Sequence, residues 1–193
     1  MPVKTTIPYS EGLFSITFTC TQWLPLIEMV QGYDIVYQWF DHLKSKGHLI
    51  CGYVIMPNHV HVMIGFRNKG QLINSIIGNG KRFMAYEIIK QLQAQRNERV
   101  LKLLTDSVEP GRKKNRKQHN VWELSFDWKK CESEKFIVQK LDYYHRNPCS
   151  GKWSLCANPV EYEHSSARYY ETGEQGHYPV IGYRELFHID LTK

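Results

Sequence analysis

The chain has 193 residues, of which 42% are hydrophobic, with a formal net charge of +6 and an isoelectric point near 9.0. This composition argues against a disordered segment, and no apolar run approaches the roughly 18 residues that a membrane span needs. The N-terminal residues lack a charged segment followed by an apolar one, so the expected location is the cytoplasm.

Two patterns alternate in the first third of the chain. Runs of alternating β-branched and aromatic residues are typical of strands, whereas apolar residues that recur every three to four positions are typical of a helix. The predicted elements are a strand at 13–20, a helix at 33–46 that Gly47 ends, and strands at 48–56 and 59–66 divided by Pro57-Asn58.

The same alternation continues after residue 70, except for one polar stretch. A helix is predicted over 72–92, although Gly78-Asn79-Gly80 weakens its first half. Residues 93–120 are polar and basic, which is typical of an insertion or a mobile loop. The remaining predicted elements are a strand at 121–126 and a helix that begins after the N-cap candidate Ser133 and ends before Pro148.

The polar stretch contains the strongest local charge in the chain. The run GRKKNRK at 111–117 places five basic side chains among seven residues. Such a run forms either a solvated loop or a surface that contacts nucleic-acid phosphates. Together with the positive net charge, it favours a polyanionic partner.

The order strand, helix, two strands, helix, strand, helix predicts an α+β fold. A ferredoxin-like antiparallel sheet with helices packed on one face fits this order best. We expect one domain over residues 1–157, with the basic insertion at about 93–120. Residues 158–193 are expected to form a C-terminal extension that packs on the same domain.

Cysteine usage indicates free thiols. The five cysteines are spaced irregularly and include no Cys-x-x-Cys pair, so neither a structural zinc site nor a disulfide framework is predicted. Buried free thiols are the expected state.

The segment YVIMPNHVHVMIGF at 53–66 contains two histidines in an apolar strand. Residues two apart on a strand face the same side, so His59, His61 and Met63 share one face. Two adjacent imidazoles can converge on a divalent metal ion, with a third ligand from elsewhere. The alternative is a pair of polar residues on a half-exposed sheet face.

Two other chemistries fit this segment poorly. Histidine-triad hydrolases need a third alternating histidine, but Met63 stands at that position. An HNH-type nuclease site, imagined from Asn58 and His59, needs a helix directly after a hairpin, whereas this run continues as a strand.

A second candidate group lies at the end of the last predicted helix, in DYYHRNP at 142–148. Tyr143 and Asn147 are four residues apart and share a helix face. Asn147 precedes a proline and is expected at the very end of the last turn, where its amide oxygen suits Mg²⁺ or Mn²⁺. Tyr144 continues the inward apolar series and is expected to be a core residue.

A metal ion held by His59, His61 and Asn147 could polarise a phosphodiester while the phenolate of Tyr143 attacks the phosphorus. The phenol has an ordinary pKa of about 10, so a base or a charge must assist it. His145 is a candidate base, but helical geometry turns it away from Tyr143. The sequence does not identify the base.

Taken together, these motifs resemble those of the REP-associated tyrosine transposases, within the wider HUH single-strand transposases. The resemblance covers roughly residues 10–170. The matching blocks, in order, are MPNHVHVMI, IIGNGKRFMAYEI, VWELSFD, YYHRNP and EYEHSSARYY. Tyr144 departs from the family pattern, which has an aliphatic residue there, and leaves a one-residue ambiguity over the nucleophile.

The resemblance implies a metal-dependent endonuclease and transposase. It would cleave and rejoin single-stranded DNA near a hairpin and leave a 5′-phosphotyrosine and a free 3′-hydroxyl. By this likeness His59, His61 and Asn147 are the metal ligands for Mg²⁺ or Mn²⁺, and Tyr143 is the nucleophile. A monomer is favoured over a homodimer, with the C-terminal tail near the site.

Two alternatives remain for the function. One is a non-catalytic protein that binds single-stranded or hairpin DNA, and the other is a replication initiator or relaxase. In every case phosphates must be neutralised, and Trp122, Trp128 and Trp153 are either base-stacking residues or buried anchors. The predicted DNA-binding residues are Lys81, Arg82, Arg112, Lys113, Lys114, Arg116 and Lys117.

Overall fold

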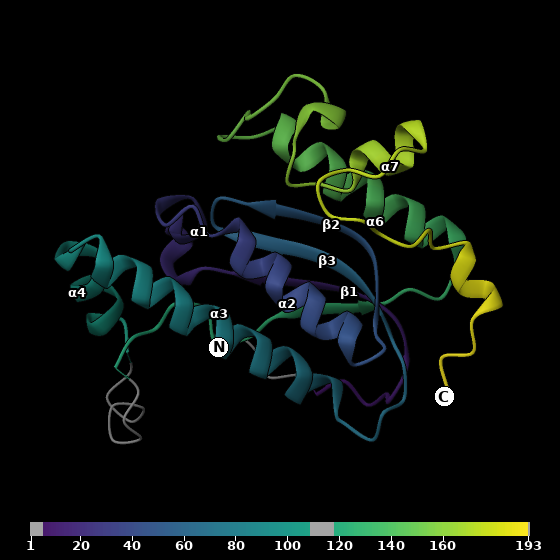
Figure 1. Cartoon of the computed structure of the whole chain (residues 1–193), viewed down its shortest axis with the longest axis horizontal. Coiled ribbons are helices and arrows are strands. Elements are labelled where there is room, and N and C mark those ends of the chain that lie inside the picture. The colour runs from purple at the N-terminus through teal and green to yellow at the C-terminus, as the bar shows by residue number, and fades with distance from the viewer. Residues whose placement is uncertain (1–5, 109–117, 193) are drawn as a thin grey trace.

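The structure is a computed structural model that describes residues 6–108 and 118–192. Four antiparallel strands form one sheet in the order β2-β3-β1-β4, which Figure 1 shows with helices around it. The α+β class with an antiparallel sheet is therefore confirmed. The strands are β1 Gly12–Thr19, β2 Leu49–Met56, β3 His59–Phe66 and β4 Asp127–Lys130.

The helices follow the predicted pattern closely in the first half of the chain. Within the described residues no helix is both long enough and apolar enough to cross a membrane. The helices are α1 Leu26–Met29, α2 Tyr33–Ser45, α3 Ile73–Ala94, α4 Glu98–Asp106, α6 Glu134–Arg146 and α7 Ala167–Thr172. Short 3₁₀ turns lie at Thr21–Trp23, Asn147–Cys149, Pro159–Glu161 and Glu185–His188.

One face of the sheet is sealed by α2 and α3, which lie in front of it in Figure 1. The alternation of β3 sends Val60, Val62 and Ile64 to this side, where all three are fully buried. Trp39 of α2 packs among them and touches Phe18 of β1 edge to face. This apolar layer is the larger of the two cores.

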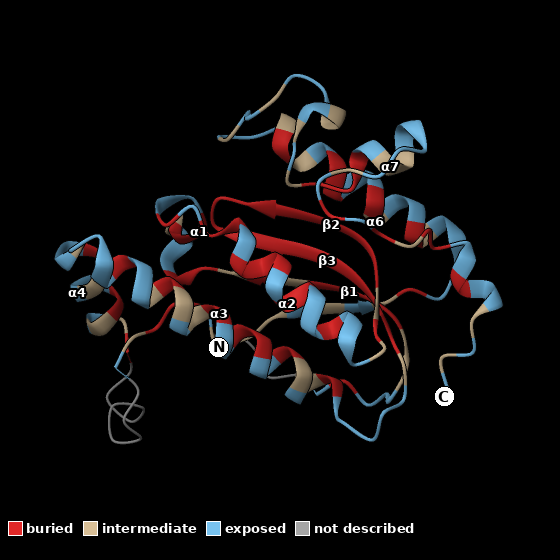
Figure 2. Ribbon diagram, viewed as in Figure 1, coloured by how far each residue is buried: buried red, intermediate tan, exposed pale blue. Residues whose placement is uncertain are grey.

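The opposite face carries α6, so the expectation that helices pack on one face only is wrong. Leu141 and Tyr144 of α6 pack against Val54 of β2 and Met63 of β3 in a second core. The first face is already filled by α2 and α3, which leaves this face to accept the apolar stripe of α6. As a result β3 is buried along its whole length and β2 from Ile50 onward, as Figure 2 shows.

The segment after residue 158 covers the outer edge of β2. Tyr53 donates its backbone N–H to Ser166 Oγ at 2.9 Å, and Ile181 donates to the Ile50 carbonyl at 3.0 Å. Tyr178 joins the first core and Tyr183 the second, so this segment passes from one face of the sheet to the other. An edge strand covered in this way is protected from pairing with other chains.

The strand predicted at 121–126 is wrong in position, because β4 begins only at Asp127. Trp122 forms a single isolated bridge with Cys20, and its buried indole N–H donates to the Lys81 carbonyl at 2.8 Å. The indole is anchored on α3, and the continuous ladder between β4 and β1 starts at Asp127, five residues later.

The stretch at 93–120 is not simply a loop. The helix α3 continues to Ala94, and α4 follows after Asn97, whose side chain accepts the Val100 N–H at 3.3 Å. Val100 and Leu104 enter the first core. Two buried residues one turn apart were enough to fold a segment whose composition is mainly polar.

All five cysteines are free, but only three are buried as predicted. Cys20, Cys51 and Cys131 are buried, whereas Cys149 and Cys156 are only half-buried, with their sulfur atoms 3.3 Å apart.

Candidate active site

The two histidines lie on the α6 side of the sheet, at the start of β3. Across the sheet His61 is paired with Thr17 of β1, and Thr17 is paired with Asp127 of β4. Paired residues of an antiparallel sheet point to the same face, so these three side chains form a row. The imidazoles of His59 and His61 have their ring centres 4.8 Å apart.

Each imidazole is oriented by a neighbour through its Nδ1 atom. His59 Nδ1 lies 2.7 Å from Asn58 Oδ1, and His61 Nδ1 lies 2.7 Å from Thr17 Oγ1. Because a carbonyl oxygen only accepts, His59 carries its proton on Nδ1 and keeps a lone pair on Nε2. Burial lowers the pKa of His59 to about 4 and, with the nearby charges of His59 and Lys140, that of His61 to about 3. Both rings are neutral at pH 7, which is the state that binds metals.

Asn147 reaches the histidines from the end of α6. Its Nδ2 lies 3.3 Å from His61 Nε2, although the two residues are 86 positions apart in the sequence. Asn147 is the C-cap of α6 but keeps helical backbone angles (φ −55°, ψ −45°), since the chain continues directly into a 3₁₀ turn. Ser133 caps the other end of α6 by accepting the Phe136 N–H, as predicted.

The two neighbouring tyrosines have opposite environments. Tyr143 is 54% exposed, and its ring centre lies 5.2 Å from that of His61. Tyr144 is 1% exposed, stacks on His61 from the other side and donates its hydroxyl to Ser15 Oγ at 2.5 Å. Burial raises the pKa of Tyr144 well above its usual range. Of the two phenols, Tyr143 is the one that a substrate can reach.

These side chains border one cavity of about 540 Å³, which we call the histidine cavity. Asp127 carries the one carboxylate among its described lining residues, and Lys140 lies one turn before Tyr143, with its Nζ 6.0 Å from the Tyr143 ring centre. The lining residues are Thr17, Thr19, Trp23, His59, His61, Asp127, Lys140, Tyr143, Tyr144, Asn147, Ser150, Gly151, Lys152 and Trp153.

The donor atoms of this cavity fit a divalent metal ion. The contact with Asn58 leaves the Nε2 lone pair of His59 available, and the Asn147 NH2 group, which only donates, faces the Nε2 lone pair of His61. Half a turn of the Asn147 amide about its Cβ–Cγ bond would present Oδ1 instead of Nδ2. Two imidazoles with an amide oxygen suit Mn²⁺, and Mg²⁺ less well. Within the described ranges no group of three His, Cys, Asp or Glu side chains could hold a metal, so an amide ligand would be required.

His145, the candidate base, does not line the histidine cavity. Its ring is 4% exposed, and its Nε2 lies 2.9 Å from Ser166 Oγ, on the side of α6 that packs against the C-terminal segment. Burial lowers the pKa of His145 to about 4. The ring therefore positions α6 and does not contact Tyr143.

The predicted DNA-binding residues have different positions. Lys81 is buried and donates to the carbonyls of Glu123 and Ser125 at 2.8 and 3.2 Å. Arg82 is exposed and donates to Asn79 Oδ1 at 3.1 Å. Arg112, Lys113, Lys114, Arg116 and Lys117 lie outside the described residues.

The three tryptophans also differ. Trp122 is buried, Trp128 is half-buried against the first core, and Trp153 lines the histidine cavity.

The sequence did not single out Thr17, Asp127 or Lys140. Thr17 and Asp127 lie beside His61 because of the register between neighbouring strands. The periodicity of a single strand does not predict that register. Lys140 could have been found, because it lies three residues before Tyr143 on the same helix.

Comparisons with known proteins support the fold. No protein-family model matches the chain, and no curated protein matches it. The solved structure of a REP-associated tyrosine transposase bound to a REP hairpin superposes with a TM-score of 0.63 and 13% identity, over 100% of this chain and 94% of that one. At 13% identity this similarity shows that the two proteins share a fold. It therefore confirms the fold that the motif resemblance implies.

A second solved structure, a Deinococcus radiodurans R1 protein assigned as a transposase, matches with 17% identity over 73% of this chain and 95% of that one. Its TM-score of 0.42 is too low to carry an argument.

Proposed function

We propose that this chain is a metal-dependent transposase and endonuclease that cleaves and rejoins single-stranded DNA near hairpins through a 5′-phosphotyrosine intermediate. One observation carries the proposal. Tyr143, half-exposed at the histidine cavity, lies beside a pair of neutral, oriented imidazoles and the amide of Asn147, which the fold brings from 86 residues away. Its neighbour Tyr144 is buried and has its hydroxyl bonded to Ser15, so Tyr143 is the phenol that DNA could reach.

In the proposed reaction the phenol oxygen of Tyr143 attacks a backbone phosphorus. The new bond joins that oxygen to the phosphorus, the bond from phosphorus to the 3′ oxygen breaks, and the 3′ oxygen takes up a proton as the free hydroxyl. The covalent link retains the phosphodiester energy, so a second 3′-hydroxyl can reverse the step and rejoin the strand. The phenol proton leaves to a base or to water.

His59, His61 and Asn147 would hold Mg²⁺ or Mn²⁺, which stabilises negative charge on the phosphate oxygens. The hydrogen bonds that join His59 to Asn58 and His61 to Thr17 would hold the two imidazoles in the orientation that this requires. Lys140 and Lys152, which line the same cavity, place positive charge where a DNA phosphate would lie.

The partner we propose is single-stranded DNA that carries a hairpin. The protein of similar fold is bound to a REP hairpin, and the net charge of +6 of this chain suits a nucleic acid. We propose that the chain acts as a monomer, with a homodimer as the alternative. The C-terminal segment already covers the edge of β2 and closes that route to a partner strand.

The test is covalent capture. The protein is incubated with end-labelled single-stranded hairpins and Mn²⁺ or Mg²⁺, and products are separated under denaturing conditions. We expect a protein–DNA adduct that disappears in Tyr143→Phe and with a chelator but persists in Tyr144→Phe, the matched control one residue away. Retarded DNA without an adduct would instead support a binding module, and an origin-like nick without preference for hairpins would support a relaxase.

A further inference from the structure

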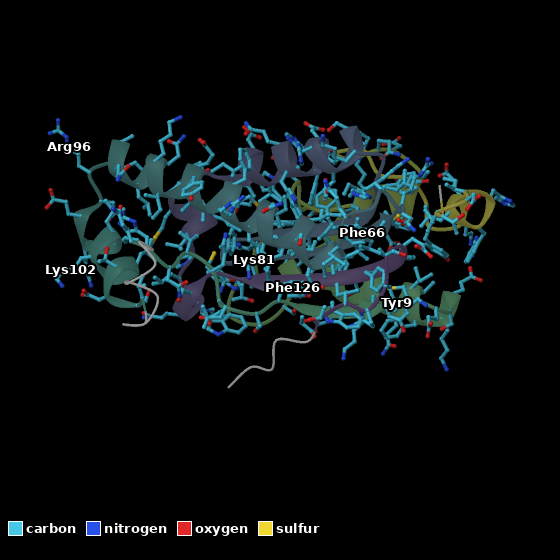
Figure 3. The ribbon with its side chains drawn as sticks, turned by 90° about the horizontal axis from the view of Figure 1, so that it is seen from below. Tyr9, Phe66, Lys81, Arg96, Lys102 and Phe126 are labelled. Atoms are coloured by element: carbon cyan, nitrogen blue, oxygen red, sulfur yellow. The ribbon has the colours of Figure 1, made fainter. Side chains whose placement is uncertain are left out.

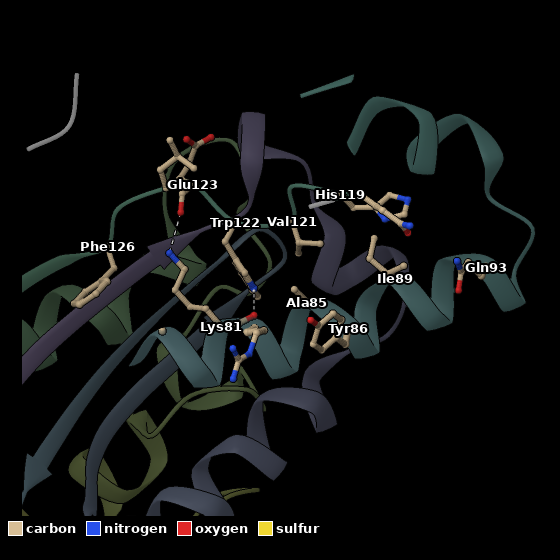
Figure 4. Close-up of a pocket in the computed structure, with 14 residues that line it drawn as sticks. Lys81, Ala85, Tyr86, Ile89, Gln93, His119, Val121, Trp122, Glu123 and Phe126 are labelled. Atoms are coloured by element: carbon tan, nitrogen blue, oxygen red, sulfur yellow. Dashed lines mark hydrogen bonds between the residues drawn. The ribbon is translucent and has the colours of Figure 1, made fainter. Parts of the chain in front are cut away.

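A second cavity lies on the other face of the sheet, between α3 and the segment 118–126 (Figure 4). We call it the α3 pocket. Its volume is about 610 Å³, slightly more than that of the histidine cavity, and it lies within the roughly 300–1,000 Å³ of typical ligand sites.

The pocket has rigid walls. Lys81 fixes one wall to the other, since its Nζ donates to the Glu123 and Ser125 carbonyls while its own carbonyl accepts the Trp122 indole N–H (Figure 4). The same ammonium lies 5.9 Å from the ring centre of Phe126, and Figure 3 shows the two side chains near each other. A preformed pocket loses less entropy on binding than a loop that must close.

Its chemistry is that of a site for a flat, polar aromatic group. Ile89 and Val121 give an apolar floor, while Gln93, Gln118 and His119 supply hydrogen-bonding groups. Tyr86, which is 68% exposed, presents an aromatic face at the rim. An exposed aromatic beside amide side chains is typical of surfaces that stack and pair with nucleic-acid bases.

The charges around the pocket favour a chain of phosphates. Arg82 is exposed at the rim, and Lys81 adds a second cation to the wall. Glu123 is the acidic residue among the described lining, and its carboxylate accepts the Gln22 backbone N–H at 2.9 Å.

The segment 123–127 contributes residues to both the α3 pocket and the histidine cavity. Cys20 is bridged to Trp122, and the Glu123 N–H donates to the carbonyl of Thr19, which lines the histidine cavity. Phe126 of the pocket is followed directly by Asp127 of the cavity. A DNA strand in the cavity can therefore reach the pocket by passing over residues 123–127.

We propose that the α3 pocket binds one unpaired base of the DNA strand whose phosphate lies in the histidine cavity. This inference rests on the proposed function and extends it, because a base held at a fixed distance from Tyr143 would select the position of cleavage. An enclosed base contributes to affinity by stacking and hydrogen bonding, and the enzyme then cuts a set number of nucleotides away.

The test is an abasic scan of the single-stranded flank of a hairpin substrate, read out as equilibrium binding without metal. For the wild type we expect one abasic position to weaken binding about tenfold or more, in line with the cost of losing one stacked base. In Ala85→Trp, whose indole fills the pocket, binding to intact DNA should fall by a similar factor and the abasic position should cause no further loss. Ala94→Trp, on an exposed part of the same helix, is the control and should match the wild type.

A second pair of variants keeps the test valid if Ala85→Trp fails to fold. Tyr86→Ala should weaken binding and reduce the effect of the abasic position, whereas Phe83→Ala, which removes another exposed aromatic of α3 that lies outside the pocket, should do neither. If no abasic position couples to either pocket variant, the pocket does not bind a base. That result leaves adduct formation by Tyr143 unaffected, so it is distinct from failure of the proposed function.

Discussion

The two faces of β3 are built from alternate residues of one eight-residue strand, yet they differ completely in character. Val60, Val62 and Ile64 lie in a dry layer sealed by α2 and α3. His59 and His61 face α6 across a cavity of about 540 Å³. Both sets are buried, so burial alone does not distinguish a core from a site.

What distinguishes the faces is how the covering helix meets the sheet. On the first face α3 and α2 cover the sheet together and pack so closely on each other that Gly80 of α3 lies against Trp39 of α2. On the second face α6 packs through Ile137, Leu141 and Tyr144, and Asn147 at its end lies over the histidines. A cavity forms where close packing stops, and polar groups can be kept there because they have partners.

The sharpest test of this contrast substitutes asparagine at one position on each face of β3. Val62→Asn should lower the free energy of unfolding by about 3–5 kcal/mol, because it removes buried methyl groups and leaves an amide without partners. His61→Asn should cost less than half of that, since its side chain faces the cavity and can keep a bond to Thr17. Urea denaturation of the metal-free proteins gives both values, and equal losses would show that the cavity face is sealed as well.

Metal affinity directly tests the face of β3 that carries His59 and His61. Asn147→Ala should weaken Mn²⁺ binding by about 10–100-fold or more, and Asn58→Ala by about 10–100-fold, because the first removes a ligand and the second frees the His59 ring. Isothermal titration calorimetry measures both. Asn79→Ala, an exposed asparagine of α3, is the control and should bind like the wild type. Unchanged affinity in Asn147→Ala would remove this amide from the proposed site.

Two glycines of α3 test how closely α2 and α3 pack on the other side of the sheet. A Cβ on Gly80 would lie 2.2 Å from Trp39 Nε1, so Gly80→Ala should destabilise the protein by about 1–3 kcal/mol. A Cβ on Gly78 meets no atom within 4 Å, so Gly78→Ala should stabilise it by about 0.5–1 kcal/mol through helix propensity. Thermal denaturation distinguishes the two signs, and a shared sign would contradict the close contact of α2 and α3.

The smallest expected effect concerns the buried phenol on the cavity side. Tyr144→Phe should cost about 1 kcal/mol of stability, because it removes a buried hydrogen bond to Ser15. A double-mutant cycle with Ser15→Ala should show that the two losses are not additive. Adduct formation should continue at the wild-type level. Loss of the adduct in Tyr144→Phe, with retention in Tyr143→Phe, would exchange the roles of the two tyrosines.

Much of the fold could be predicted from the sequence, because local periodicity carries the information. The helix at 33–46 and the strand at 59–66 agree with α2 and β3 to within one residue, and Ser133 caps α6 as expected. The errors occur where tertiary contacts overrule local pattern. Trp122 is held by α3, which delays β4 until Asp127, and Val100 anchors α4 in a stretch that reads as a loop.

The sequence by itself determined that His59 and His61 share a face of a strand and that Tyr143 and Asn147 share a face of a helix, because both relations follow from the repeat of a single element. Only the tertiary structure decided that these two faces meet, that Thr17 and Asp127 stand beside them, and that helices cover both sides of the sheet. Register between strands and the choice of face for a helix depend on the packing of the whole chain. No short segment contains that information.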